Sequence, residues 1–182
     1  MRRQITEKEK ERCYQFARTI IKGGDQFNRF NQNERTQINR TYIGKLGEYV
    51  FLKMLHEQGV SYEEGDMFEI FAGKENADTY DFMTWEKKTV DIKTASLPFH
   101  QRIMVPMSQF HLKKDYYVGI KLNFFGIEKG QIKPALIKDC EFCGYVERSA
   151  LEKQPTQHFG EGPCKAFKLK DLKPIKELIE LF

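Results

Sequence analysis

The sequence predicts an α/β protein in which helices flank one central mixed β-sheet. Apolar residues recur at helical spacing over residues 6–23 and 41–58, whereas the segment 80–94 alternates with the period of two that is typical of strands. The chain has 182 residues, without an internal repeat or a linker rich in Pro, Gly or Ser. We therefore expect a single domain over residues 1–182.

The N-terminal forty residues divide into a helix and a polar connector. The helix is predicted over residues 6–23, where Thr6 and Glu9 have the spacing of a capping box. Residues 25–40 are too polar for a core, so we expect a loop or a short surface helix there. Basic residues in this connector and at the start of the next helix suit phosphate and base-edge contacts, and a solvated polar connector is an equal alternative for them: Arg29, Arg35, Arg40 and Lys45.

A second helix is predicted over residues 41–58, because its apolar residues form one stripe and Gly59 provides a stop. Glu48 lies at the margin of that stripe, so we expect its side chain to be half-buried at the edge of the core. After residue 60 the pattern changes to the period of two. Strands are expected at 60–64, 67–71, 80–85, 89–94, 102–105, 116–122 and 132–138, with short helices at 106–114 and 172–181.

The two strands around Glu86 form a predicted hairpin. Its expected register pairs Phe82 with Val90 on an apolar face and sets Asp81 opposite Asp91 on the other face. Directly opposed residues have their Cβ atoms about 4.5–5.5 Å apart, and like charges in that position are destabilising. The two carboxylates therefore indicate a bound cation that offsets their repulsion.

A divalent metal fits these carboxylates, because Mg²⁺ prefers carboxylate and carbonyl oxygens and leaves positions open for water and a substrate phosphate. Lys93 follows Asp91 on the same strand face, where its charge can orient and activate a metal-bound water. Glu48 is a candidate for a further ligand or for a ligand of a second metal.

The charge distribution agrees with a metal site between surfaces that meet a polyanion. Residues 48–92 carry 4 Lys and Arg against 11 Asp and Glu. The flanks are basic, with 11 against 5 in residues 1–47 and 15 against 10 in residues 93–182.

Three segments, in this order, resemble the PD-(D/E)XK nuclease superfamily, which has the restriction-endonuclease-like fold: Tyr42-Ile43-Gly44-Lys45-Leu46-Gly47-Glu48, Tyr80-Asp81-Phe82 and Val90-Asp91-Ile92-Lys93-Thr94. The resemblance covers residues 41–122. It departs from the family pattern at Tyr80, where the motif has proline, and Asp78 is a rival for the first aspartate that lacks the cross-strand partner.

The resemblance implies a role for each motif residue. Asp81, Asp91 and the backbone carbonyl of Ile92 would bind Mg²⁺, for which Mn²⁺ can substitute. Lys93 would position and activate the attacking water, and Glu48 would assist as a ligand or through water. Residues 41–122 would then be a catalytic core, preceded by the helix and basic connector of 1–40 and followed by the strands and helix of 123–182.

The implied function is a Mg²⁺-dependent endodeoxyribonuclease that hydrolyses DNA phosphodiester bonds by in-line attack and leaves a 5′-phosphate. A homodimer is expected when both strands are cut, and restriction or defence against mobile elements is the expected setting. The alternatives are a Holliday-junction resolving or repair nuclease, a non-cleaving DNA-binding subunit with the same fold, and a structural α/β protein with an incidental charged hairpin.

The remaining sequence features suggest no other cofactor class. Cys140, Cys143, His158 and Cys164 could form a zinc site, and free half-buried cysteines are the alternative. There is no phosphate-binding loop or dinucleotide fingerprint, so no nucleotide cofactor is expected. The chain has neither a long apolar run nor an apolar signal region after its charged start, so we expect no membrane association and a cytoplasmic location.

Overall fold

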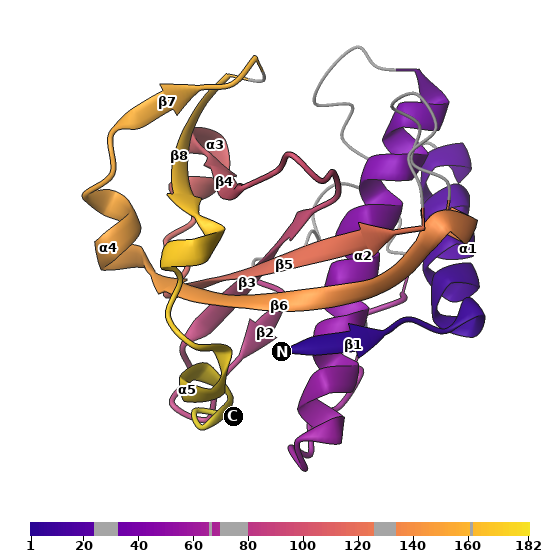
Figure 1. Cartoon of the computed structure of the whole chain (residues 1–182), viewed down its shortest axis with the longest axis horizontal. Coiled ribbons are helices and arrows are strands. Elements are labelled where there is room, and N and C mark those ends of the chain that lie inside the picture. Colours follow the sequence, from indigo (N-terminus) through magenta and orange to yellow (C-terminus); the bar gives the residue numbers. More distant parts are fainter. Residues whose placement is uncertain (24–32, 66, 70–79, 126–133, 161) are drawn as a thin grey trace. The chain divides into compact units, whose positions relative to one another are not determined.

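A computed structural model describes residues 1–23, 33–65, 67–69, 80–125, 134–160 and 162–182. They form an α/β protein with a five-stranded mixed sheet and a second sheet of three antiparallel strands (Figure 1). The chain divides into two compact units. We call Met1–Arg3, Thr79–Asn123 and Asp139–Phe182 the hairpin unit, and Gln4–Asp78 with Phe124–Lys138 the helical unit. None of the helices in the described part of the chain combines the length and apolarity that a membrane crossing needs.

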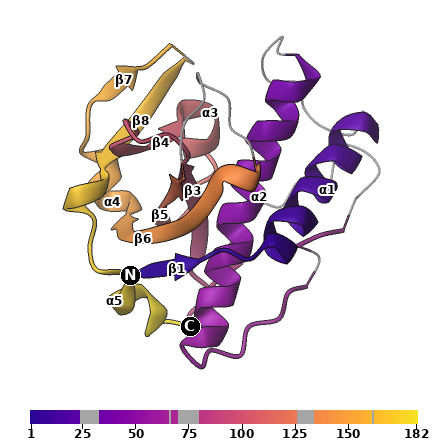
Figure 2. The ribbon, with the colours of Figure 1, turned by 45° about the vertical axis from the view of Figure 1, so that its right-hand side comes forward.

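Two long helices dominate the helical unit, α1 (Glu7–Gly23) and α2 (Glu34–Glu57), and they lie side by side (Figure 2). The capping box at the start of α1 is confirmed. The backbone N–H of Thr6 donates to Glu9 Oε2 at 2.8 Å, and the N–H of Glu9 donates to Thr6 Oγ1 at 3.3 Å. The contact between them includes an edge-to-face pair of the half-buried Tyr14 and the fully buried Tyr42, with ring centroids 5.6 Å apart.

Helix α2 begins well before the predicted start at residue 41. Asn33 is its N-cap, and its Oδ1 accepts hydrogen bonds from the backbone N–H and the hydroxyl of Thr36, both at 2.9 Å. Only Ile38 is buried between Glu34 and Arg40, so these turns lack the apolar stripe that reveals a helix. The second part of the expected connector is therefore helix, and residues 24–32, with Arg29, lie outside the described residues.

The strand expected at residues 60–64 does not form. Gly59 ends α2 with a φ of +82°, and the next N–H, that of Val60, donates back to the carbonyl of Leu55 at 3.0 Å. The carbonyl of Tyr62 contacts His56 Nε2 at 2.7 Å. These groups are bound to the helix end and are not available to a sheet. Residues 67–69 are not a strand either, and residues 70–71 lie outside the described part.

The five-stranded sheet has the order β1-β6-β5-β3-β2. Strand β3 runs parallel to β5 and antiparallel to β2, so the sheet is mixed as predicted. The predicted strand at 132–138 is wrong in position, because a single 3₁₀ turn, Pro134–Leu136, precedes a strand that starts at Ile137. The bounds are β1 (Arg2–Gln4), β2 (Phe82–Met83), β3 (Thr89–Ala95), β5 (Tyr116–Phe124) and β6 (Ile137–Glu147).

Aspartate 115 links the starts of the two parallel strands. Its Oδ2 accepts hydrogen bonds from the N–H of Thr89 at 2.9 Å and from the Thr89 hydroxyl at 2.8 Å. Its own N–H donates to the Thr89 carbonyl at 3.1 Å. These bonds fix β3 against β5 in the register that pairs Val90 with Tyr116.

A second sheet, with the order β4-β8-β7, corrects the expectation of a single sheet. Strand β4 was predicted, whereas β7 and β8 were not: β7 has only three residues, and in β8 the adjacent apolar residues Ala166 and Phe167 interrupt the alternation of the sequence. The bounds are β4 (Arg102–Pro106), β7 (Thr156–His158) and β8 (Pro163–Lys168). The helical segments of this unit are short: α3 (Met107–Phe110), α4 (Arg148–Glu152), the 3₁₀ turn Leu169–Asp171 and α5 (Ile175–Ile179). Helices α3 and α5 are shorter than predicted, and Pro174 precedes α5 as its N-cap.

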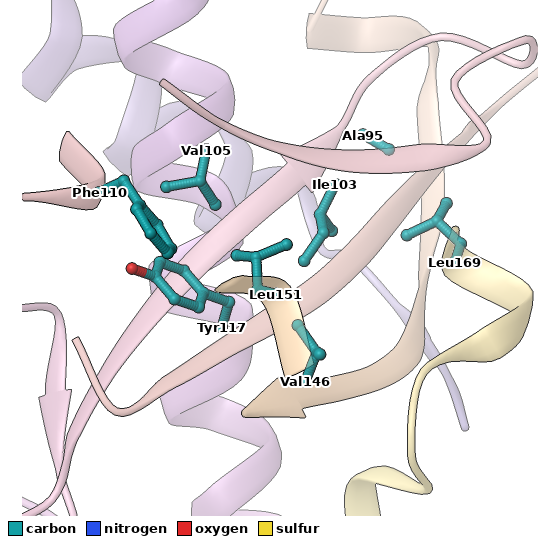
Figure 3. Close-up of a cluster of buried hydrophobic side chains, with 8 residues drawn as sticks. All are labelled: Ala95, Ile103, Val105, Phe110, Tyr117, Val146, Leu151 and Leu169. Atoms are coloured by element: carbon teal, nitrogen blue, oxygen red, sulfur yellow. The ribbon is translucent and has the colours of Figure 1, made fainter. Parts of the chain in front are cut away.

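A cluster of buried side chains lies between strands of both sheets of the hairpin unit (Figure 3). Inward residues of β4 meet residues of β3, β5 and β6 there, and α3 and α4 each contribute one side chain. Burial of this apolar surface joins the small sheet to the larger one. The members are Ala95, Ile103, Val105, Phe110, Tyr117, Val146, Leu151 and Leu169.

Gly144 in β6 cannot be replaced without strain. Its φ is +139°, and an added Cβ would lie 2.1 Å from the backbone carbonyl oxygen of Lys173. We expect Gly144→Ala to lower the free energy of unfolding by at least about 2 kcal/mol in urea denaturation. Gly44→Ala is the matched control: Gly44 lies within α2 with nothing within 4 Å of an added Cβ, so a gain of about 0.5–1 kcal/mol is expected. Equal effects at the two positions would contradict this prediction.

The Asp115 link predicts an acid-sensitive part of the stability. Burial alone would raise the pKa of Asp115, but the hydrogen bonds from Thr89 and the charges of Lys88 and Arg148 outweigh it and lower that pKa below its usual value. A lowered folded-state pKa stabilises above the unfolded pKa, and this contribution disappears as the pH falls through the folded pKa. We expect Asp115→Asn to cost about 0.5–1 kcal/mol at pH 7 and progressively less below pH ~4. Denaturant titrations of both proteins across that range measure it, and a pH-independent difference would contradict it.

Candidate metal and phosphate site

The hairpin has the predicted register. Phe82 lies opposite Val90 and Met83 lies opposite Thr89. Asp81 precedes β2, and its direct opposition to Asp91 stays a prediction. Phe82 and Val90 are fully buried, whereas both aspartates are half-buried. Asp91 lies on the face of β3 opposite to Val90 and Ile92, and the Asp81 carboxylate lies at the edge of β3, beside the Ile92 N–H.

Asp81 lies one residue before β2, and its side chain extends the hydrogen bonding between β2 and β3 by one bond. Its backbone N–H donates to the Val90 carbonyl at 3.1 Å, and its Oδ2 accepts the N–H of Ile92 at 2.6 Å. A carboxylate therefore receives a ladder hydrogen bond that a backbone carbonyl would otherwise accept. This bond fixes Asp81 beside β3, and a charged acceptor makes it one of the stronger kinds.

The backbone of Ile92 points toward Asp81. In a strand the N–H and C=O of one residue point to the same edge. Because the Ile92 N–H bonds to Asp81, its carbonyl faces the β2 edge as well. This places one carbonyl oxygen on the same side of β3 as the Asp81 carboxylate.

Asp91 and Lys93 share one face of β3, and their charged ends are in contact. Lys93 Nζ lies 2.5 Å from Asp91 Oδ2 and 3.1 Å from Gln109 Oε1 of α3. The Asp91 and Lys93 side chains are only 15% and 16% exposed. Although Asp91 Oδ2 is buried, the short contact with Lys93 lacks hydrogen-bond geometry, and no other described residue donates to this oxygen. We treat the contact as an ion pair that leaves the hydrogen-bonding capacity of Oδ2 unused.

Tyr117 lies beside Asp91 on the neighbouring strand β5. Burial, together with the negative charge of Asp91, raises the pKa of Tyr117 to about 12. The phenol is therefore neutral at physiological pH and adds no further negative charge next to the two aspartates.

Glu48 lies on α2 in the helical unit and is half-buried as predicted, with 22% of its side chain exposed. Lys45 Nζ lies 2.6 Å from Glu48 Oε2 and donates to the carbonyl of Met67 at 2.8 Å. Lys45 is thus engaged within this unit. The joint action of Glu48 with the hairpin carboxylates stays a prediction, as does a DNA contact by Arg35 or Arg40.

The four residues of the possible zinc site do not gather. Cys140 and Cys143 are three residues apart on β6, an odd separation that directs side chains to opposite faces, while His158 lies on β7 and Cys164 on β8. All cysteines are free thiols, and burial raises the pKa of Cys143 to about 11. Within the described ranges, no three or more His, Cys, Asp and Glu side chains come together as a metal cluster.

This arrangement limits the kind of ion that the hairpin can bind. Asp81 and Asp91 are two carboxylates, and further ligands must be backbone carbonyls or water. Mg²⁺ binds in that manner, through one or two carboxylates with several retained waters, whereas structural zinc requires four protein ligands. The hairpin therefore suits a hard cation whose remaining positions are open to a phosphate.

Gln109 is the residue of this site that the sequence did not reveal. It belongs to no motif, and its contact with Lys93 depends on how the fold brings α3 to β3. The usable signal is indirect: α3 directly follows β4, and its Phe110 enters the buried cluster, which fixes the short helix in place.

No protein-family model, curated protein or solved structure compared with the chain matches it. The assignment of this site therefore depends on its own geometry and chemistry.

The bond between Asp81 and Ile92 predicts a difference between two substitutions. Asp81→Ala removes the acceptor of the Ile92 N–H and is expected to lower the unfolding free energy by about 1 kcal/mol. Asp81→Asn keeps an oxygen acceptor and removes the repulsion with Asp91, so in metal-free buffer its stability is expected to equal or exceed that of the wild type. Urea denaturation in EDTA measures both, and an Asn variant as unstable as the Ala variant would contradict the hydrogen bond.

Proposed function

We propose that this protein is a Mg²⁺-dependent endodeoxyribonuclease of the PD-(D/E)XK superfamily with a restriction-endonuclease-like fold. One observation carries the proposal: the Asp81 carboxylate accepts the N–H of Ile92, and Ile92 lies between Asp91 and Lys93, which form an ion pair. Like charges at neighbouring positions of paired strands are destabilising unless a positive charge offsets them. A lysine and a metal together provide such charge in phosphodiester hydrolysis.

The residues present fit a magnesium ion. Asp91 Oδ2 is buried with unused acceptor capacity, the Asp81 carboxylate is fixed by the Ile92 N–H, and the Ile92 carbonyl faces the same edge. All three groups offer oxygen, which Mg²⁺ prefers. We assign Asp81, Asp91 and the Ile92 carbonyl as ligands of Mg²⁺ or Mn²⁺, with Glu48 as an assisting residue that acts directly or through water.

When bound, the metal would supply Lewis acidity that lowers the pKa of water and balances charge on the phosphate. Lys93 Nζ, placed between Asp91 and Gln109, would orient the attacking water and donate to a phosphate oxygen as negative charge develops on it. The ion pair with Asp91 and the hydrogen bond to Gln109 would keep its ammonium group in place. The product would carry a 5′-phosphate, and a homodimer would cut both strands, in restriction or in defence against mobile elements.

A second candidate is a DNA-binding subunit that does not cleave. The Lys93–Asp91 ion pair favours it, because that contact already offsets part of the repulsion between the aspartates without a metal. Stability in the presence of metal separates the two candidates, since only the nuclease requires an ion at the hairpin.

Cleavage assays test the proposal directly. The purified protein is incubated with plasmid, linear and branched DNA in Mg²⁺, Mn²⁺ or EDTA, and the branched substrate distinguishes a junction-resolving nuclease. We expect Mg²⁺-dependent cleavage that falls by about 10²–10³-fold or more in Asp91→Asn and in Lys93→Met. We also expect saturating Mg²⁺ to add about 1–3 kcal/mol to the unfolding free energy of the wild type and not of Asp91→Asn.

Two matched variants serve as controls. Asp115→Asn changes an aspartate of the same sheet that binds Thr89, and Lys121→Met changes a β5 lysine that donates to the Pro98 carbonyl at 3.2 Å. Both are expected to cleave at close to the wild-type rate at pH 7. Equal cleavage by the wild type and both site variants would refute the assigned site, and metal-independent DNA binding without cleavage would favour the second candidate.

A further inference from the structure

The three-stranded sheet brings two positive charges together on its outer face. The register of β4 and β8 sets Arg102 directly opposite Lys168, and both side chains are exposed. Like charges at directly opposed positions destabilise an antiparallel pair.

The alternation along β4 explains why this pair faces outward. Ile103 and Val105 belong to the buried cluster, as Figure 3 shows. Side chains alternate along a strand, so Arg102 and Met104 point to the other face of the sheet. Met104 is 40% exposed. The outer face therefore combines charge with exposed apolar surface.

Nothing acidic in this sheet neutralises the pair. Strands β4, β7 and β8 contain no Asp or Glu, and neither Arg102 nor Lys168 forms an ion pair with any acid in the part of the chain that the structure describes. The contact seen at Arg102 is aromatic: its guanidinium lies over the ring of Phe159, 5.8 Å from the centroid, and that ring is 43% exposed. A cation next to an exposed ring matches surfaces that bind phosphates and stack bases.

We propose that the outer face of β4 and β8, with Arg102, Lys168 and Phe159, binds the phosphate backbone of the nucleic acid on which the hairpin acts. This inference rests on the proposed function for the identity of the polyanion. Both basic side chains contact phosphates, and their repulsion is relieved when the polyanion binds. Because phosphate contacts carry no base information, this surface contributes affinity and orientation independent of sequence.

The test measures binding of a fluorescein-labelled DNA duplex by anisotropy in EDTA over a range of salt concentrations. We expect Lys168→Ala to reduce the slope of log affinity against log salt by about 1, and the double variant Arg102→Ala/Lys168→Ala to reduce it by about 2. Lys176→Ala is the matched control, because Lys176 is exposed on α5 and carries the same charge. A control that changes the slope as much as Lys168→Ala would overturn the proposal.

A charge reversal separates lost contacts from lost folding. Lys168→Glu places opposite charges across the two strands, so the thermal midpoint is expected to stay equal or rise while DNA binding weakens by about tenfold or more. A lower midpoint, or binding as tight as that of the wild type, would overturn the proposal.

The outcomes distinguish this inference from the nuclease assignment. If all these variants bind DNA as tightly as the wild type, the proposed phosphate-binding surface is wrong, and the proposed cleavage site is unaffected. Weaker binding in the variants, in a protein that cleaves no substrate with any metal, supports the surface and overturns the nuclease. Binding of the wild type to phosphatidylserine vesicles, without binding to DNA, overturns the nucleic-acid partner.

Discussion

Strand β3 is bonded along both of its edges, and its register determines what every neighbouring side chain can do. The backbone groups of Val90 and Ile92 bond toward Asp81 and β2, whereas the Thr89 carbonyl bonds toward Asp115 and β5. A shift by one residue would turn Asp91 and Lys93 to the face that carries Val90 and Ile92, and would break the contact of Lys93 with Gln109. The core and the candidate site therefore depend on the same pairing, and neither can move independently of the other.

The hairpin unit contains two groups of like charge, Asp81 with Asp91 and Arg102 opposite Lys168, and different contacts offset the repulsion in each. Lys93 and the Ile92 N–H contact the aspartates, so the acidic pair is partly balanced from within. At the basic pair, a Phe159 ring lies beside Arg102, which offers much weaker compensation than a carboxylate. Features that destabilise a fold locally, such as like charges close together, are often found at functional sites, and these two pairs are such features.

Local signals account for what the sequence predicted correctly. The hairpin register follows from the period of two around a tight turn, and the capping box of Thr6 and Glu9 follows from spacing alone. The strand predicted at 60–64 was wrong because the end of α2 and His56 bind the backbone of this segment. The spacing of apolar residues gives no sign of such contacts. Strands β7 and β8, and the contact of Gln109 with Lys93, arise from packing between segments distant in sequence. The residues of the candidate site could thus be named from the sequence, whereas the contact of Gln109 with Lys93 and the basic face could not.

The pairing of β1 with β6 has a consequence for how the chain folds. Met1 and Phe142 are 141 positions apart, yet the Phe142 N–H donates to the Met1 carbonyl at 2.8 Å, and Arg2 lies 3.1 Å from the buried carboxylate of Asp139. Closing so long a loop costs entropy before any contact offsets it, so this strand is expected to join late. Until then β6 has an open edge that can pair with another chain. Strand β1, only three residues long, therefore protects the sheet against intermolecular pairing.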